Sequence, residues 1–117
     1  MKINSFRPGN VDISEIISDD VLLKNEQDVI SLLSEGLSDH IILYEHNVEK
    51  DFFDLSTRIA GNILQKFTNY HIHLAIVGNF DTYPSKTLKD FIYESNNTKD
   101  HLFVGSRDDA IQLWMKQ

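Results

Sequence analysis

The sequence predicts a single α/β domain, spanning residues 1–117, around a mixed and mostly parallel β-sheet of about five strands. Short apolar runs alternate with amphipathic helical segments, and a Pro-Gly turn joins two extended segments at the start. The resulting order is β-β-α-β-α-β-α-β-α. Because strands separated by helices pair in parallel through right-handed crossovers, the carboxyl ends of the later strands are expected at one edge of the sheet.

The opening segments predict a hairpin, a helix and a buried strand. In Arg7-Pro8-Gly9-Asn10, Pro at the first central position and Gly at the second favour a type II turn between two antiparallel strands. Asn25 opens an amphipathic helix that ends near Gly36, with apolar residues at i, i+3 and i+4 from Val29. The continuous apolar run 41–44 is typical of a strand that is covered on both faces.

The middle of the chain predicts a second helix and a second buried strand. Asp54 or Ser56 is expected to cap a helix that carries one apolar stripe and stops near Asn69. Residues 72–77 follow as a strand, and Gly78 ends it. Small residues in the helix favour close packing against the sheet.

The last third predicts a helix, a strand and a terminal helix. Ser85 is expected to cap the first of these helices, and Asn96-Asn97 indicates where it stops. Residues 101–104 predict the last strand. The acidic residues that follow Ser106 favour the start of the terminal helix, because the helix dipole attracts negative charge there.

Composition and charge indicate a soluble, cytoplasmic protein. The chain has no cysteine, which excludes disulfides, thiolate zinc ligands and cysteine nucleophiles. The formal net charge of −7 disfavours binding to nucleic acid and to anionic membranes. The N-terminal segment lacks the apolar core of a signal peptide, and no stretch approaches the roughly 18 apolar residues of a membrane span. No cofactor is expected.

Three segments resemble a bacterial family of unassigned function, the domain-of-unknown-function family 4180. They are FFDLSTRIAGNILQKF at 52–67, LAIVGNF at 74–80 and KDFIYESN at 89–96. Together they cover about half of the region from Asp51 to the end, whereas the first fifty residues resemble the family only loosely. The resemblance implies membership of a family and implies no particular activity.

The order of elements is also similar to that of STAS domains, which occur in anti-sigma factor antagonists. That resemblance implies a regulatory serine at the start of the helix after the third strand. Ser56, with Thr57 as the second choice, stands at the matching place. The STAS signature Asp-Ser-Ser-Gly-Leu-Gly is not reproduced, because Arg58 and Ile59 interrupt it. The resemblance implies a regulatory, protein-binding role that phosphorylation switches.

The most polar convergence is expected where the parallel strands end. Ligands of open α/β sheets bind outside the carboxyl ends of the strands, and the helix starts point to the same edge. We expect the tips that follow Tyr44, Val77 and Val104 to gather along one rim. The candidate binding or regulatory residues are Glu45, His46, Asp54, Ser56, Thr57, Arg58, Asn79, Asp81 and Arg107.

A hydrolase at this rim would use Ser56 as nucleophile and His46 as general base, with Glu45 or Asp81 to orient the base. The chain lacks the Gly-x-Ser-x-Gly elbow that exposes a strained serine. A helix cap at Ser56 and a solvated His46 are therefore favoured, and no catalytic residue is assigned.

Two further pairs of residues, one of histidines and one of phenylalanines, are candidates for a functional role. His71 and His73 would face the same way on a strand and would begin a zinc site if a third ligand joined them; none is indicated, and no metal is expected. Phe52 and Phe53 are adjacent, so they cannot both face inward from one strand or helix. We expect one of them in an exposed loop, where it would suit contact with a partner.

Two functions are compatible with these features. The first is a non-enzymatic regulatory or protein-binding module, switched by phosphorylation at Ser56, with an unidentified protein partner. The second is a small enzyme or ligand sensor with a pocket at the strand ends. A homodimer through an exposed edge strand is compatible with either function.

Overall fold

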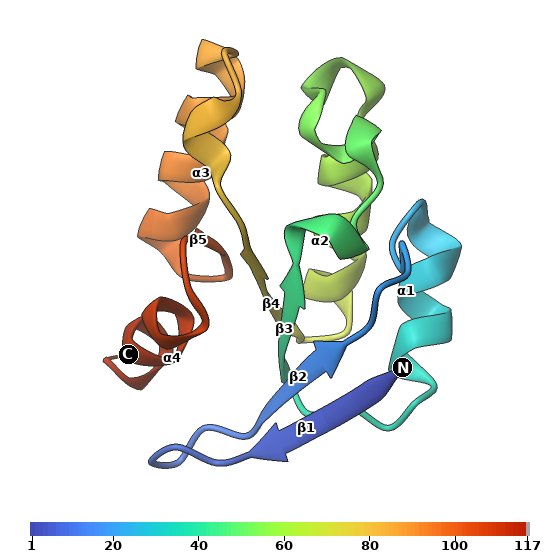
Figure 1. Ribbon diagram of the computed structural model, residues 1–117, viewed down its shortest axis with the longest axis vertical. Coiled ribbons are helices and arrows are strands. Elements are labelled where there is room, and N and C mark those ends of the chain that lie inside the picture. Colours follow the sequence, from blue (N-terminus) through green and yellow to red (C-terminus); the bar gives the residue numbers. More distant parts are fainter. Residues whose placement is uncertain (117) are drawn as a thin grey trace.

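A computed structural model describes residues 1–116, which form one five-stranded sheet with helices on both faces (Figure 1). The strands lie in the order β1-β2-β3-β4-β5; the first pair is antiparallel and the other pairs are parallel. This confirms the mixed, mostly parallel α/β fold. The strands are β1 (Lys2–Phe6), β2 (Ile13–Ile17), β3 (His40–Tyr44), β4 (His73–Val77) and β5 (His101–Val104).

The hairpin between β1 and β2 is confirmed, but its turn lies one residue later than expected. The backbone N–H of Val11 donates to the carbonyl of Pro8 at 3.2 Å, so Gly9 is the first central residue of the turn. Gly9 has a φ of 60°, a conformation that glycine adopts without steric cost. The last paired residues of the two strands are Phe6 and Ile13, so the turn lies within a longer loop and does not join the strands directly.

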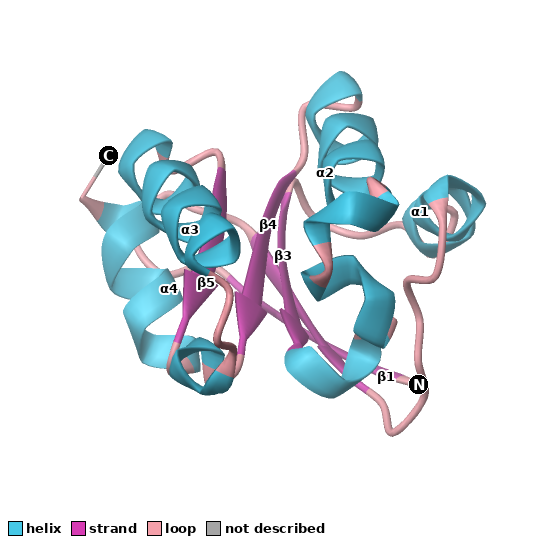
Figure 2. Ribbon diagram, turned by 90° about the horizontal axis from the view of Figure 1, so that it is seen from above, coloured by secondary structure: helices cyan, strands magenta, loops and turns pink. Residues whose placement is uncertain are grey.

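The helices divide unequally between the two faces of the sheet (Figure 2). Apolar residues of α1, α2 and α3 form one buried cluster with the sheet, and those of α4 form a second cluster on the opposite face. Neighbouring residues of β3 serve both clusters, since Ile41 belongs to the first and Ile42 to the second. The helices are α1 (Glu26–Leu33), α2 (Ile59–Asn69), α3 (Lys86–Thr98) and α4 (Arg107–Met115).

Most helix boundaries agree with the sequence. The side chains of Asn25, Ser85 and Ser106 each accept a hydrogen bond from a backbone N–H in the first turn of α1, α3 and α4 respectively. Helix α3 ends at Thr98, one residue after the predicted stop signal Asn96-Asn97. Asn96 is a helical residue whose side chain binds the backbone of β5.

The predicted caps of α2 are wrong. Between β3 and α2 the chain forms three short 3₁₀ turns, η1 (Glu45–Asn47), η2 (Lys50–Phe53) and η3 (Leu55–Thr57). Asp54 caps η3 by accepting from the N–H of Ser56, whereas α2 begins at Ile59 after Arg58, whose φ is 64°. The apolar stripe of α2 is as expected, but the polar residues before it belong to separate turns.

Candidate functional site

The carboxyl ends of β3, β4 and β5 lie side by side, as predicted. Tyr44 pairs with Val77 and Val77 with Val104 in the parallel register. Beyond the strands, the N–H of Gly78 donates to the carbonyl of Val104 at 2.9 Å. The residues that follow these strand ends therefore share one rim.

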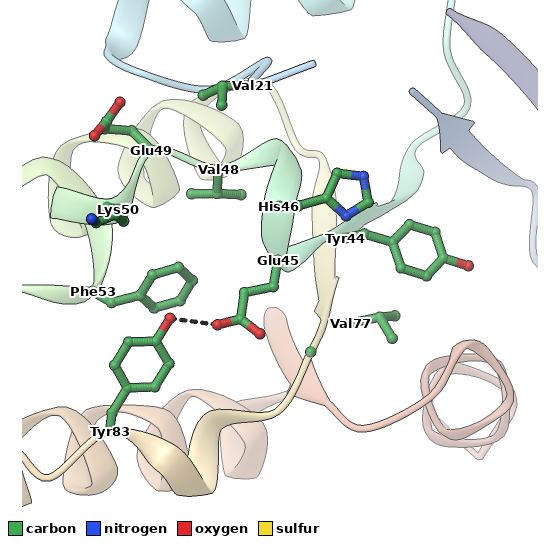
Figure 3. A pocket seen from close by; sticks show the side chains of 11 residues that line it. Val21, Tyr44, Glu45, His46, Val48, Glu49, Lys50, Phe53, Val77 and Tyr83 are labelled. Carbon is green, nitrogen blue, oxygen red and sulfur yellow. Dashed lines mark hydrogen bonds between the residues drawn. The ribbon is translucent and has the colours of Figure 1, made fainter. Parts of the chain in front are cut away.

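The central side chain of the rim is that of Glu45, the first residue after β3. One of its carboxylate oxygens accepts a hydrogen bond from the backbone N–H of Asn79 at 3.1 Å, and the other accepts from the hydroxyl of Tyr83 (Figure 3). Gly78 permits this arrangement, since an added Cβ would lie 2.5 Å from the Glu45 Oε1 atom. Glu45 thus links β3 to the loop after β4.

Glu45 borders a cavity of about 660 Å³ at this rim. The rings of Phe53 and Tyr83 stack with their centroids 5.1 Å apart, and both side chains lie toward the Glu45 carboxylate (Figure 3). We call this cavity the strand-end pocket. It is lined by Val21, Tyr44, Glu45, His46, Val48, Glu49, Lys50, Phe53, Val77, Gly78 and Tyr83.

The expectation that Phe52 or Phe53 is exposed is wrong. Phe52 has no exposed surface, and Phe53 is 5% exposed. The 3₁₀ turn η2 directs both rings inward, Phe52 toward Phe103 and Phe53 toward Tyr83. A 3₁₀ turn has neither the alternation of a strand nor the single buried stripe of an amphipathic helix, so adjacent residues can both be buried.

The hydroxyl of Tyr83 is held in its protonated form. Burial, together with the hydrogen bond to Glu45 and the negative charge of that carboxylate, raises the pKa of Tyr83 to about 12. At neutral pH Tyr83 therefore donates its proton to Glu45 in a hydrogen bond. No sequence pattern indicates this pairing, since Tyr83 lies beyond the residues that directly follow β4.

His46 lies on the rim but not in a catalytic arrangement with Ser56. The Nε2 atom of His46 is 2.8 Å from the carbonyl oxygen of Ser18, and its ring stacks near that of Tyr44. The Ser56 hydroxyl instead donates to Asp54 Oδ1 at 2.7 Å. The expected nucleophile and base thus have different partners.

Asp54, Ser56, Thr57 and Arg58 lie together in and beside η3, and none of these four residues lines the strand-end pocket. The Thr57 hydroxyl donates to the carbonyls of Asp51 and Asp54, both at 2.8 Å. These contacts hold the 3₁₀ turn together. Ser56 and Arg58 are exposed.

Asn79 and Asp81 line a second cavity on the same rim, between the loop after β4 and the end of β5. This cavity measures about 410 Å³. Its lining also includes Phe80, Ile92 and Asn96. Gly78 borders both cavities, so the two hollows are neighbours.

Arg107 does not line the strand-end pocket. Its Nε atom forms an ion pair with Glu15 at 3.1 Å, and its guanidinium lies 4.5 Å from the centre of the Phe6 ring. Burial would raise the pKa of Glu15, but hydrogen bonds from Tyr44 and Asn4 and the charge of Arg107 outweigh it and lower that pKa. Glu15 was not singled out in the sequence, although its place in alternation with Ile13 indicates an inward-facing position.

The two strand histidines do not form a pair. His71 has a φ of 59° and lies in the turn before β4, whereas His73 is the first residue of that strand and stacks on His40. Among residues 1–116, no group of three or more His, Cys, Asp or Glu side chains is placed to hold a metal ion.

Among the described residues, no helix is both long and apolar enough to cross a membrane.

Comparisons with known proteins place the chain in a family. No curated protein and no solved structure shows a significant match to the chain. A family model described as a domain of unknown function (DUF4180) matches residues 8–113, so the protein belongs to the DUF4180 family.

Proposed function

We propose that the protein is a non-enzymatic regulatory module that binds a small ligand in the strand-end pocket. The observation that carries this proposal is a cavity of about 660 Å³ at the carboxyl ends of β3 and β4. Small-molecule sites commonly measure about 300–1,000 Å³ and occur at the ends of parallel strands.

The lining of the pocket supports the proposal. Its walls are largely apolar and aromatic, with Val48, Phe53 and Val77 all less than one tenth exposed. Glu45 supplies a polar group whose position is fixed by Asn79 and Tyr83. A few fixed polar groups in an apolar cavity are typical of ligand sites, because the polar groups set orientation while the walls exclude water.

A thermal-shift screen with a library of small metabolites tests the proposal. A ligand present at 100 times its dissociation constant stabilises the protein by about 2.7 kcal/mol. Val21 lines the pocket and is 43% exposed, so Val21→Trp is expected to fill the pocket and abolish the shift. Ile30 on α1 is 41% exposed and outside the pocket, and Ile30→Trp should leave the shift unchanged. A ligand that raises the melting temperatures of both variants equally would contradict the proposal.

Ser56 supports a second candidate function, a protein-binding module switched by phosphorylation, in keeping with the resemblance to STAS domains. The Ser56 side chain is exposed, and its hydroxyl lies 2.7 Å from a carboxylate oxygen of Asp54. A phosphate there would carry about −1.5 to −2 charge and would be repelled by Asp54. Because Asp54 caps η3, phosphorylation would break the cap and change this surface.

Variants at Ser56 test the second candidate in a pull-down from the native host. Ser56→Ala removes only the hydroxyl and is expected to retain the partner. Ser56→Asp places a second carboxylate beside Asp54 and is expected to lose it. If the same proteins are captured by the wild type and by both variants, the proposal of a phosphorylation switch at Ser56 is wrong.

A further inference from the structure

We propose that the ligand of the strand-end pocket carries an organic ammonium group, which binds the carboxylate of Glu45 while an apolar or aromatic body rests on Phe53 and Tyr83. This inference rests on the proposed function, since it assigns the chemistry of the ligand to the same pocket. It requires that Glu45 be charged, accessible and without a cationic partner of its own.

Glu45 has hydrogen-bond donors but no counter-ion. The Asn79 N–H and the Tyr83 hydroxyl that bind it are both neutral groups. Among residues 1–116, no Lys, Arg or His side chain forms an ion pair with Glu45. A carboxylate offers about four acceptor positions, so each oxygen can accept at least one more hydrogen bond. An ammonium group supplies both the missing charge and the missing donors.

Glu15 provides an internal comparison. Its side chain is 7% exposed and accepts a hydrogen bond from a tyrosine, as that of Glu45 does. In contrast to Glu45, Glu15 has an ion pair with Arg107 at 3.1 Å. The chain thus neutralises the Glu15 carboxylate with its own arginine, whereas the half-buried Glu45 carboxylate, which faces the strand-end pocket, has no such partner.

The walls of the pocket select an organic cation rather than a metal ion. Phe53 and Tyr83 line the pocket beside the carboxylate and supply aromatic surface for the body of an organic ligand. Val48 and Val77 add apolar surface for the body of the ligand. A divalent cation would need several oxygen ligands, and no cluster of three or more acidic or histidine side chains suited to a metal occurs in residues 1–116.

An anionic ligand is the alternative, because the exposed residue Lys50 also lines the pocket. An anionic ligand would bind Lys50 and be repelled by Glu45 and Glu49. The formal charge of the lining, with two glutamates against one lysine, favours a cation. Substitutions at Lys50 and Glu45 therefore separate the two cases.

The test is an NMR titration of the ¹⁵N-labelled full chain with three probes of matched shape. The probes are 2-phenylethylammonium, the neutral 2-phenylethanol and the anionic 3-phenylpropionate. The ammonium probe is expected to shift the resonances of Gly78 and Asn79 and to bind about tenfold more tightly than either other probe, since a hydrogen bond to a charged group is the stronger kind.

Variants assign that preference to Glu45. Glu45→Gln keeps the shape of the side chain and one acceptor oxygen, so the variant should fold. It is expected to lower the affinity for the ammonium probe about tenfold and to leave the affinity for 2-phenylethanol unchanged. Lys50→Met should not weaken the ammonium probe. Glu35→Gln removes the charge of an exposed residue after α1 and is the charge-matched control, with no expected effect.

The outcomes separate this inference from the proposed function. If 2-phenylethanol or 3-phenylpropionate binds at the pocket as tightly as the ammonium probe, the pocket is a ligand site but the ammonium assignment is wrong. An effect of Glu35→Gln equal to that of Glu45→Gln would also overturn the assignment, because it would indicate general charge attraction. If no probe shifts any resonance of the pocket, the ammonium inference is wrong, and the thermal-shift screen decides the proposed function separately.

Discussion

Gly78 and Glu45 show how a single absent methyl group positions the site. The Glu45 side chain lies against the backbone of Gly78, and a Cβ there would come within 2.6 Å of the Glu45 Cβ atom. Because that atom is next to the backbone of η1, rotation of the side chain alone cannot relieve the contact. The residue after β4 must therefore be glycine for steric reasons, without any need for positive φ.

Alanine substitutions at two glycines test this account. Gly78→Ala is expected to destabilise the protein by about 1–3 kcal/mol, because the overlap forces the rim apart. Gly61 lies in α2 with no atom within 4 Å of an added Cβ, so Gly61→Ala is expected to stabilise by up to about 1 kcal/mol through helix propensity. Urea denaturation measures both effects. Equal effects of the two substitutions would contradict the steric account.

His101 is a buried histidine whose two ring nitrogens both have partners. Its Nδ1 accepts from the N–H of Leu74 at 3.1 Å, and its Nε2 lies 2.8 Å from the Thr68 hydroxyl, which itself donates to the Leu64 carbonyl. This pattern fits the neutral ring with its proton on Nε2. Burial, more than the opposing charge of Asp100, lowers the pKa of His101 from 6.5 to about 4.

The lowered pKa of His101 predicts a loss of stability in mild acid. The folded protein binds this proton less readily than the unfolded chain does, so the free energy of unfolding falls as the pH drops from 6.5 toward 4. The shift corresponds to about 3 kcal/mol. Urea denaturation across this pH window measures it, and His101→Gln should flatten the dependence. A variant that keeps the wild-type slope would contradict this role.

Glu15 acts in a separate pH window. Its folded pKa lies below the ordinary 4.5, so its stabilising contribution is present above that pH and is lost as the pH falls further. Both groups make the protein more stable at neutral pH, but the loss of stability between pH 6.5 and 4.5 is due mainly to His101.

Helix α3 protects the outer edge of the sheet with side-chain hydrogen bonds. β5 is the last strand in the sheet order, and its outer backbone groups are those of His101 and Phe103. The Asn96 side chain accepts from the Phe103 N–H at 2.8 Å and donates to the Phe103 carbonyl at 3.0 Å. Ser95 donates to the His101 carbonyl at 2.7 Å. An unpaired strand edge is thereby covered.

Adjacent asparagines in α3 test the role of this edge cover. Asn96→Ala removes two hydrogen bonds to half-buried backbone and is expected to destabilise the protein by about 1–3 kcal/mol. Asn97 is exposed on the same helix, and Asn97→Ala should change stability by no more than about 0.5 kcal/mol. Thermal unfolding of both variants measures the difference. A similar stability for the two would show that Asn96 does not hold β5.

The elements that sequence patterns predicted well are those defined by apolar periodicity. The stripe of α2 and the apolar runs of β3 and β4 fixed their type and most of their limits. The segment 45–57 has no such period, and its turns depend on contacts with distant residues. Asn47, for example, is fully buried and donates to the carbonyls of Ser18 and Asp20, which no local pattern indicates.

At the scale of the whole molecule, topology explains which candidate residues came together. Parallel pairing predicted a shared rim after β3, β4 and β5, and Glu45, His46 and Asn79 lie there. Arg107 follows β5 but turns toward Glu15 beside α4, because a buried carboxylate attracts it. Phe53 and Tyr83 complete the pocket from loops whose paths depend on tertiary packing, so the sequence did not predict their roles.

The contact between Glu45 and Tyr83 fixes the carboxylate in the strand-end pocket, and the ionisation of Tyr83 measures that contact. Tyrosine ¹³Cζ NMR, followed to the alkaline limit of the folded state, should give Tyr83 a pKa of about 12. In Glu45→Gln this pKa should fall below 12 but stay above 10, because burial, its largest cause, remains, whereas the pKa of Tyr44, which pairs with Glu15, should stay at about 12. A wild-type pKa for Tyr83 near 10, or one that Glu45→Gln leaves unchanged, would contradict the proposed geometry of the pocket.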